Sequence, residues 1–581
     1  MSRRPSRARP AAQKKAQAPT PPPAPRWTER LRPWHVAAAL AALHLLLAGL
    51  AFDPTPNPGG DNAAYVALAR SLLERGTYQE LWDPAMRPHV QYPPGWPLIL
   101  AAGRIVGVTS WVGMKVMVLL FSVLAVTLSY LWARRVSTRG VALAVGLLLA
   151  VGPGVLATAH SELSDVPFWA FTMLALWAFA RARPADAGPV MSTDGGTLWP
   201  LAIAAAATLA AYATRSAGLP LVLAAGGWLT WKRRWRDLAI LAGVVLPFAV
   251  AWWMRARTMD GPGYTSFLWY VDPYRPSLGM VTFGGMLERV ARNTGKYVGE
   301  HIPVLLIGAR NTALATAVGV TVVGLAAAGW ALRVSRAGVA EFLLPLYLGL
   351  VLVWPAEWAG QRFILPVLPL LLLYAAETVR AGADRVGAAR VAGVAATGLV
   401  LLMALPAQKV AVSAGSYCRK EFRRGEPFPC VLPVWQDFFE LAGQTRGTLP
   451  KGSVVLSRKP TLFWALSGYP SRTYPFSAEP DTLLRTAREA GAEYVVADGV
   501  DNLAAMYLAP VLIRRSKGFC VVRSMGPDGP TLMGILPNAE RAPDTGSGRE
   551  GETVTLGFAG CGPAYRAGPD GGRLGPEHLL R

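Results

Sequence analysis

Long apolar runs separated by short basic connections are the feature of this sequence that most limits its fold. The first run is Trp34–Phe52, and ten more follow at about 112–133, 138–158, 166–181, 198–214, 217–231, 238–254, 311–332, 339–356, 363–378 and 389–407. Such runs suit helices that cross a lipid bilayer. Only 16% of the residues are charged, against about 25% in average soluble domains. We therefore predict a polytopic α-helical membrane protein with about 11 transmembrane helices.

The basic residues predict which side of the membrane each connection faces. On this count of spans, five connections fall on the side of the N-terminal tail: "WARRVSTRG", "RARPAD", "WKRRWRD", "RVSRAG" and "RAGADRVGAAR". Cytoplasmic loops carry an excess of Arg and Lys. We therefore expect a multi-pass protein of the cell membrane, with the basic, disordered tail 1–33 in the cytoplasm. The same distribution explains the formal net charge of +22 without a nucleic-acid partner.

The opposite, extracytoplasmic side then holds two long loops and a C-terminal region. The transmembrane domain, 34–407, contains these loops at 53–111 and 255–310. Within the first loop, the apolar run 96–108 is too short to span comfortably, so it is interpreted as an interfacial or re-entrant helix. Region 408–581 alternates strand and helix patterns, which predicts a small α/β domain followed by a disordered tail.

The four cysteines of the chain all fall in region 408–581, and they are Cys418, Cys430, Cys520 and Cys561. An even number of cysteines on the extracytoplasmic side favours disulfides. The pair Cys418–Cys430 is favoured because the loop it closes is short. Four free buried thiols are the alternative.

Polar side chains gather at the outer ends of the predicted spans and leave the span centres nearly bare. They are Asp61 after the first span, Lys115 at the start of the second, Glu162 and Asp165 in "HSELSDVPF", Arg215 at the end of the fifth span, and Arg362 at the start of the tenth. A carboxylate can take a proton from an acceptor hydroxyl or amine. Arg and Lys can hold a phosphate as it leaves. The combination fits group transfer from a lipid phosphate.

Four stretches resemble a known family of enzymes. "DNAAYVALARSLLERGTY" and "QYPPGWPLIL" are similar to the first outside loop of the polyprenyl-phosphate-sugar-dependent glycosyltransferases of the GT-C fold. The most similar pattern is that of the protein O-mannosyltransferase and aminoarabinose-transferase group. "SELSDVPF" and "QRFILPVLPLLLLY" resemble that group's second outside corner and late-span motif. The resemblance covers about 30–380 and implies that Asp61 is the catalytic carboxylate.

These observations predict a glycosyltransferase that moves a sugar from a polyprenyl-phosphate carrier to an extracytoplasmic lipid, protein or polysaccharide. Direct displacement with Asp61 as base would invert the anomeric centre. Substrate binding is expected from Glu162, Asp165, Arg215, Arg362, Lys115 and Tyr65. Many relatives have two adjacent acids where this chain has Asp61 and Asn62, so no cofactor or metal is expected. A divalent metal shared with Glu162 or Asp165 stays open.

Each of these residues also has a simpler interpretation. Asp61 precedes an apolar helical pattern and could be only an N-cap. The two arginines could extend to the interface without binding substrate, and His160 is interpreted as a packing or hydrogen-bonding residue. A transporter or flippase for lipid-linked substrates is an alternative function, although transporters place ionisable residues near the midplane of the membrane. A non-catalytic membrane scaffold is the second alternative.

Overall fold

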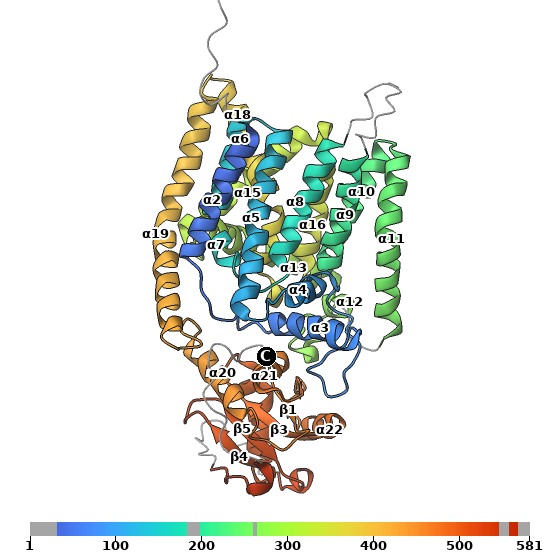
Figure 1. Cartoon of the computed structure of the whole chain (residues 1–581), viewed down its shortest axis with the longest axis vertical. Coiled ribbons are helices and arrows are strands. Elements are labelled where there is room, and N and C mark those ends of the chain that lie inside the picture. Colours follow the sequence, from blue (N-terminus) through green and yellow to red (C-terminus); the bar gives the residue numbers. More distant parts are fainter. Residues whose placement is uncertain (1–31, 183–197, 260–263, 545–556, 567–581) are drawn as a thin grey trace, which may run out of the picture.

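The computed structural model describes residues 32–182, 198–259, 264–544 and 557–566, so most of the tail 1–33 lies outside them. Each of the eleven expected spans corresponds to one helix or to two helices joined at a bend (Figure 1). The bundle consists of α2 (Pro33–Leu50), α5 (Trp111–Val136), α6 (Arg139–Val151) with α7 (Pro153–Thr158), α8 (Asp165–Arg181), α9 (Trp199–Thr214), α10 (Leu219–Trp231), α11 (Trp235–Thr258), α15 (Ala313–Arg333), α16 (Val339–Val353), α17 (Gln361–Ile364) with α18 (Leu368–Asp384), and α19 (Ala389–Arg423).

Helix length and lipid-facing side chains support a membrane location. Among the described residues, six helical segments are long and apolar enough to cross a membrane, and the others are shorter apolar helices of the same bundle. Helices α11 and α19 stand at opposite flanks in Figure 1 and bury little of their surface inside the protein. On α19, Val391, Val394 and Leu402 are all more than 60% exposed. Such a surface is stable when lipid covers it. This protein is a multi-pass helical membrane protein.

The two loops that the sequence predicts to lie outside are both at the lower end of the bundle in Figure 1. The first loop forms α3 (Asp61–Arg75), which lies across this end, and α4 (Gly95–Ile105), which matches the expected short interfacial helix. The second loop forms α12 (Tyr264–Leu268), the short η3 (Pro276–Leu278), α13 (Phe283–Lys296), the π-helical turn η4 (Tyr297–His301) and α14 (Ile302–Ile307).

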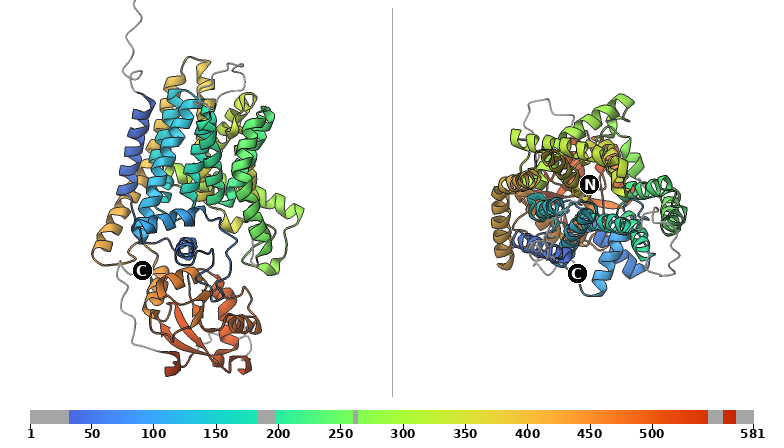
Figure 2. Two further views of the ribbon diagram at one scale, coloured as in Figure 1. Left: turned by 45° about the vertical axis from the view of Figure 1, so that its right-hand side comes forward. Right: turned by 90° about the horizontal axis from the view of Figure 1, so that it is seen from above.

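The C-terminal region forms the predicted α/β domain, which lies below α3 and α4 in Figure 1 and in the left view of Figure 2. Its five-stranded sheet has the order β2-β1-β3-β5-β4. Strands β2, β1 and β3 are parallel, with Val455 opposite Ser471 and Tyr494, and β5 is antiparallel to both β3 and β4. The strands are β1 (Val454–Leu456), β2 (Ser471–Arg472), β3 (Ala492–Ala497), β4 (Phe519–Ser524) and β5 (Thr531–Ile535), and the helices are α20 (Pro433–Thr445), α21 (Pro460–Ser467), α22 (Pro480–Ala490) and η8 (Ala504–Leu508) with α23 (Ala509–Arg514).

The last helix of the bundle, α19, joins the two parts of the protein. Helix α19 does not end near residue 407 but continues to Arg423, so the expected domain boundary lies inside a helix. The Arg419 guanidinium donates hydrogen bonds to the carbonyls of Gly49, Leu50 and Phe52 at the end of α2. A Cβ on Gly415 would lie 2.5 Å from the Ala51 carbonyl carbon, so glycine permits this close approach. The carboxyl end of the first helix is therefore capped by the last one.

All four cysteines form disulfides, which confirms the prediction. Cys418 on α19 bonds to Cys430, as expected from the short loop, and Cys520 on β4 bonds to Cys561. The first disulfide ties the end of α19 to the segment that leads into α20. The second ties β4 to the segment 557–566.

Candidate active site

Asp61 lies at the first position of α3, whose first half is buried on all sides from Asn62 to Ala69. The N-cap is Gly60, which has a φ of +94° and no side chain to cap the helix, so the interpretation of Asp61 as the N-cap is wrong. The Asp61 carboxylate points elsewhere. Its Oδ1 accepts a hydrogen bond of 3.1 Å from the Tyr92 hydroxyl, and its Oδ2 lies 3.5 Å from both terminal nitrogens of Arg362.

Two arginines from different helices meet at the ring of Phe363. Arg362 lies in α17, and Arg215 follows the last residue of α9. The guanidinium carbons of Arg362 and Arg215 are 4.9 and 5.4 Å from the centre of this ring. Since cations are attracted to aromatic faces, the Phe363 ring stabilises both guanidinium groups.

Asp165 and Ser164 contact the Arg215 guanidinium, and Tyr65 contacts Ser164. Arg215 Nη1 lies 3.0 Å from Asp165 Oδ1 and donates a hydrogen bond of 3.0 Å to Ser164 Oγ. The Tyr65 hydroxyl lies 2.9 Å from the same Ser164 Oγ. Burial raises the pKa of Tyr65 to about 12, so this hydroxyl stays neutral.

A cavity of about 440 Å³ opens beside these residues. Asp61, Tyr65, Arg215 and Arg362 all line it, so the structure brings together four of the seven predicted site residues, and Asp165 contacts one of them. The remaining walls come from α16, from the two outer loops and from the loop before α17, and they include the aromatic residues Tyr92, Tyr274, Tyr297, Tyr347, Trp354, Trp358 and Phe363. The cavity therefore combines a carboxylate and two cations with an apolar, aromatic lining.

Lys115 and Glu162 lie elsewhere, and neither lines this cavity. The Lys115 ammonium donates to the Asp53 carbonyl at 2.8 Å and lies 3.7 Å from the Glu162 carboxylate, which in turn accepts from the Asn57 amide at 3.2 Å. Burial raises the pKa of Glu162, and the nearby Lys115 opposes that rise. Both side chains hold the chain segment between α2 and α3. Lys115 also lines a second cavity of about 280 Å³, together with Asp53 and His160.

His160 and Asn62 have the environment of structural residues. The His160 ring lies 5.6 Å from the Phe52 ring, and burial lowers its pKa to about 4, so it is neutral at pH 7. Asn62 is fully buried and donates its side-chain amide to the Asn57 carbonyl. Asp61 thus has no second acid next to it in the chain.

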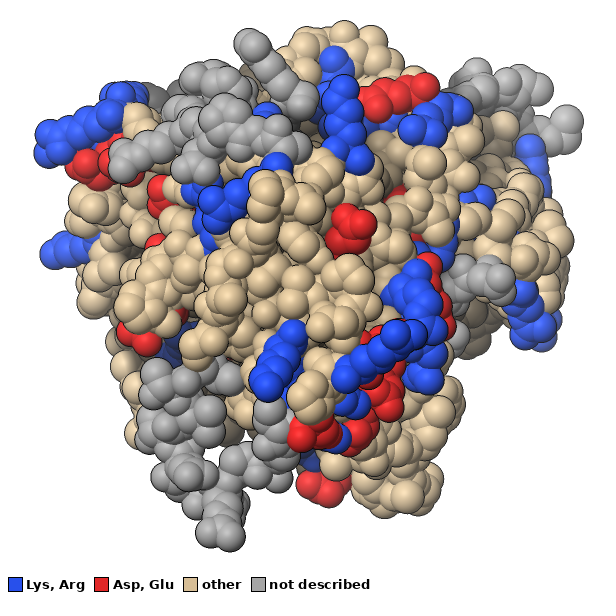
Figure 3. Space-filling view, turned by 90° about the horizontal axis from the view of Figure 1, so that it is seen from below, with Lys and Arg blue, Asp and Glu red and all other residues tan. Residues whose placement is uncertain are grey.

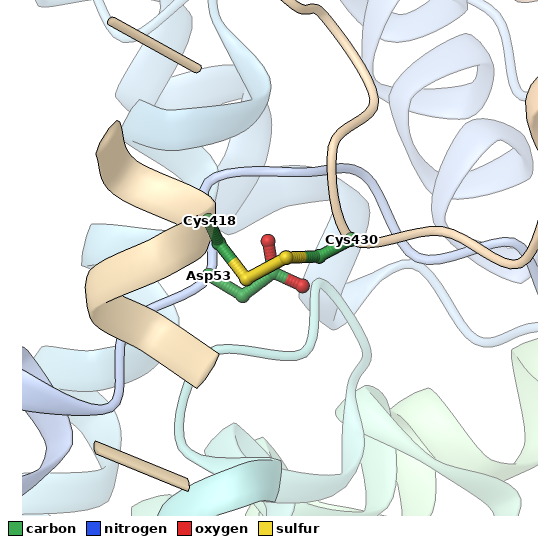
Figure 4. A group of neighbouring side chains, drawn as sticks. All are labelled: Asp53, Cys418 and Cys430. Carbon is green, nitrogen blue, oxygen red and sulfur yellow. A yellow bond between two sulfur atoms is a disulfide. The ribbon is translucent and has the colours of Figure 1, made fainter. Parts of the chain in front are cut away.

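One group of potential metal ligands occurs among the described residues, and it is away from Asp61. Figure 4 shows the Asp53 carboxylate beside the Cys418–Cys430 disulfide. Sulfur binds metals as a free thiolate, so the bonded pair leaves a single carboxylate, which already accepts two hydrogen bonds from Thr55. That the enzyme needs no metal stays a prediction.

Several residues around Asp61 escaped the sequence analysis. Tyr92 belongs to the motif "QYPPGWP", which is typical of a rigid turn. This motif in the loop after Asp61 is the sequence feature that could have indicated Tyr92. A Cβ on Gly95 of the same motif would lie 2.6 Å from the Ala213 backbone, so the turn fits closely against α9. Lys459 and Thr461 of the C-terminal domain contact Gly59 and Gly60. No sequence pattern linked them to a loop 400 residues earlier.

The fold is similar to those of two solved membrane glycosyltransferases. No protein-family model matches the sequence, and no curated protein matches it by sequence. The crystal structure of ArnT from Cupriavidus metallidurans bound to undecaprenyl phosphate is 16% identical with a TM-score of 0.50, over 86% of this chain and 98% of ArnT. The oligosaccharyltransferase AglB from Archaeoglobus fulgidus, in complex with an inhibitory peptide and a dolichol-phosphate, is 15% identical with a TM-score of 0.52, over 88% of this chain and 74% of AglB. This protein has the GT-C fold of membrane glycosyltransferases, as its sequence motifs suggested.

Proposed function

We propose that this protein is a glycosyltransferase that moves a sugar from a polyprenyl-phosphate carrier to an acceptor on the extracytoplasmic side. One observation carries the proposal. The Asp61 carboxylate and the guanidinium groups of Arg215 and Arg362 line one cavity. The structures of ArnT with undecaprenyl phosphate and of AglB with dolichol-phosphate support the proposal, because they show that this fold accommodates a polyprenyl phosphate.

Each polar group in the cavity suits one part of the transfer. The acceptor hydroxyl or amine attacks the anomeric carbon and gives its proton to the Asp61 carboxylate, and the bond from the anomeric carbon to the phosphate oxygen breaks. The phosphate leaves with the bonding electrons, and Arg362 and Arg215 stabilise its charge. A single displacement of this kind inverts the anomeric centre. The contacts of 3.5 Å between Arg362 and Asp61 are at the long limit of hydrogen bonding, so Arg362 can turn toward a phosphate.

The cavity suits the two ends of such a substrate. The apolar and aromatic walls fit a polyprenyl chain and the faces of a sugar ring, while the charged groups fit the phosphate. A transporter would instead be expected to carry its ionisable residues near the middle of the membrane. In this cavity the charged residues come from α3, from the end of α9 and from the start of α17, which all lie at the end of the bundle.

The substitution Asp61→Asn tests the proposal. It keeps the size of the side chain but removes the group that accepts the proton, and a general base contributes about 10²- to 10⁴-fold to the rate. Sugar transfer in membranes supplied with the carrier lipid should therefore fall by at least about 100-fold. The membrane level and thermal unfolding should match those of the wild type.

Asp237→Asn is the matched control, because Asp237 pairs with Arg234 at the start of α11 and does not line the cavity. It should leave the rate unchanged. If Asp61→Asn retains more than about a third of the wild-type rate, well outside the range expected for a base, Asp61 is not the base. If the protein is a non-catalytic scaffold, its function should not change when Asp61 is replaced.

A further inference from the structure

The C-terminal domain reaches the turn that carries Asp61. After β1 the chain passes Lys459 and enters α21, whose first residues face Gly59 and Gly60. The Thr461 hydroxyl donates a hydrogen bond of 2.9 Å to the Gly60 carbonyl, and the Lys459 ammonium donates one of 3.3 Å to the Gly59 carbonyl. Both donors therefore bind the backbone immediately before the proposed base.

The Thr461 bond acts on the peptide unit that Asp61 shares. The Gly60 carbonyl and the Asp61 amide belong to one planar group, so holding that oxygen holds the plane from which the Asp61 side chain extends. Gly60 has a φ of +94°, and a Cβ there would lie 3.3 Å from Thr461 Oγ1. Glycine turns of this kind have many accessible conformations. The Gly60 carbonyl accepts the first hydrogen bond of α3, from the Ala64 amide at 3.2 Å, and the Thr461 hydroxyl adds a second bond to the same oxygen from outside the helix.

The Lys459 ammonium adds a positive charge beside the same turn. Burial lowers the pKa of Lys459, as does the neighbouring Arg458, whereas the carboxylates of Asp61, Asp501 and Asp498 oppose this. The ammonium also lies 5.4 Å from the Trp435 ring. Lys459 is thus held in place by the C-terminal domain and shares the electrostatic environment of Asp61.

We propose that Thr461, assisted by Lys459, is a positioning residue through which the C-terminal domain sets the orientation of Asp61. This inference rests on the proposed function, in which Asp61 is the base. The C-terminal domain is then part of the machinery for turnover, although neither Thr461 nor Lys459 lines the cavity.

Thr461→Val tests the inference, because valine has the shape of threonine and lacks the donor. A net hydrogen bond of ordinary strength corresponds to about a 3- to 10-fold change, so kcat should fall by about that factor. KM for the polyprenyl-phosphate sugar should stay near the wild-type value, because Thr461 does not line the cavity. Thr461→Ser keeps the hydroxyl and should restore most of kcat.

Thr486→Val is the matched control, since the Thr486 hydroxyl bonds to the Thr482 carbonyl within α22, away from Asp61. It should leave kcat unchanged. If Thr461→Val has the wild-type kcat, or if Thr461→Ser is as slow as Thr461→Val, the inference is wrong. Should Thr461→Val fail to reach the membrane, Lys459→Met and Lys459→Arg decide the question by the same measurement: loss with Met and recovery with Arg support it, and wild-type turnover with Met overturns it.

The roles of Asp61 and Thr461 can fail separately. An Asp61→Asn enzyme that still transfers sugar overturns the role of Asp61 as the base and the inference with it. An inactive Asp61→Asn enzyme combined with a fully active Thr461→Val enzyme overturns the inference alone.

Discussion

Arg362 contacts the proposed base and is the residue that we propose stabilises the leaving phosphate. It contacts Asp61 Oδ2 and the Phe363 ring, and it lies in the same cavity as Arg215. Removing a donor that stabilises charge in a transition state costs about 10²- to 10³-fold in kcat. We therefore expect Arg362→Ala to slow sugar transfer by about that factor. Arg362→Lys should recover part of the rate because it keeps the charge but loses the planar pair of donors.

The comparison for this prediction is Arg380→Ala, on α18. Arg380 bonds to Glu377 and Asp384 and does not line the cavity. Transfer rates measured over a range of carrier concentrations should show a defect for Arg362→Ala and none for Arg380→Ala. Equal kcat and KM in Arg362→Ala and the wild type would contradict the role of Arg362 in the transfer.

Single residues show how far a sequence can predict such a site. Asp61, Arg215 and Arg362 could be found because they lie next to apolar runs, which fixes the end of the bundle at which each side chain sits. Lys115 and Glu162 satisfy the same rule, yet they bind the segment between α2 and α3 instead of facing the cavity. The apolar runs of the sequence predict how deep a residue lies in the membrane. The direction in which its side chain points depends on packing between helices, which the runs do not predict.

Strand β2 and the first outer loop form one unit through a buried ion pair. The Arg472 guanidinium donates to both carboxylate oxygens of Asp83, at 3.0 and 2.8 Å, and the Ser471 amide donates to the Trp82 carbonyl. The Asp83 side chain is 1% exposed. Leaving a buried charge without its partner typically costs about 3–5 kcal/mol, and the cost here is smaller because Asp83 keeps its ion pair with Arg87 at 2.8 Å. Arg472→Met should therefore lower the thermal unfolding midpoint of the detergent-solubilised protein by several degrees.

This ion pair also predicts in which direction the stability of the fold changes with pH. Burial acts to raise the pKa of Asp83, but hydrogen bonds from Arg472 and the Ala85 amide, with the charge of Arg87, hold it below its ordinary value. A carboxyl group with a lowered pKa stabilises the fold above its ordinary pKa, and this contribution is lost as the pH falls through the lowered value. The wild-type midpoint should thus approach that of Arg472→Met below about pH 4. A difference that stays constant from pH 7 to pH 3 would contradict this account.

The elements differ in how well the sequence predicts them. Apolar runs identified the spans because hydropathy changes sharply at their ends. The same signal placed the end of the last span near residue 407, whereas α19 continues to Arg423, because the polar residues that follow are still compatible with a helix. The sheet order β2-β1-β3-β5-β4 was out of reach, since the pairing of strands depends on contacts distant in the chain.

At the scale of the whole molecule, the structure places the predicted connections at opposite ends of the bundle. The end of α5 and the start of α11 lie at the upper end in Figure 1, and α3 and the C-terminal domain lie at the lower end. Basic loops are retained in the cytoplasm. A reporter fused after Arg135 or Arg236 should therefore report the cytoplasm, and one fused after Asp61 or Ser453 should report the outside. Fusions at residues 61 and 453 that report opposite sides would contradict the topology and the common location of the site.

The face of the molecule that is seen from below carries charges of both signs. Seen from below, acidic side chains lie beside basic ones, with broad uncharged areas between them (Figure 3). Nucleic-acid binding calls for a continuous basic patch. On the described part of this face, the net charge of +22 is not gathered into such a patch.

The contact between the first and last helices implies an order of assembly during synthesis. Arg419 caps carbonyls at the end of α2, and Leu50 is 369 residues away from it in the chain. Carbonyls at a helix end have no partner within their own helix, and chains are made from the N-terminus onward. The ribosome thus delivers α2 to the membrane long before its cap exists. The bundle becomes complete only when α19 is inserted, at the moment when the C-terminal domain starts to emerge.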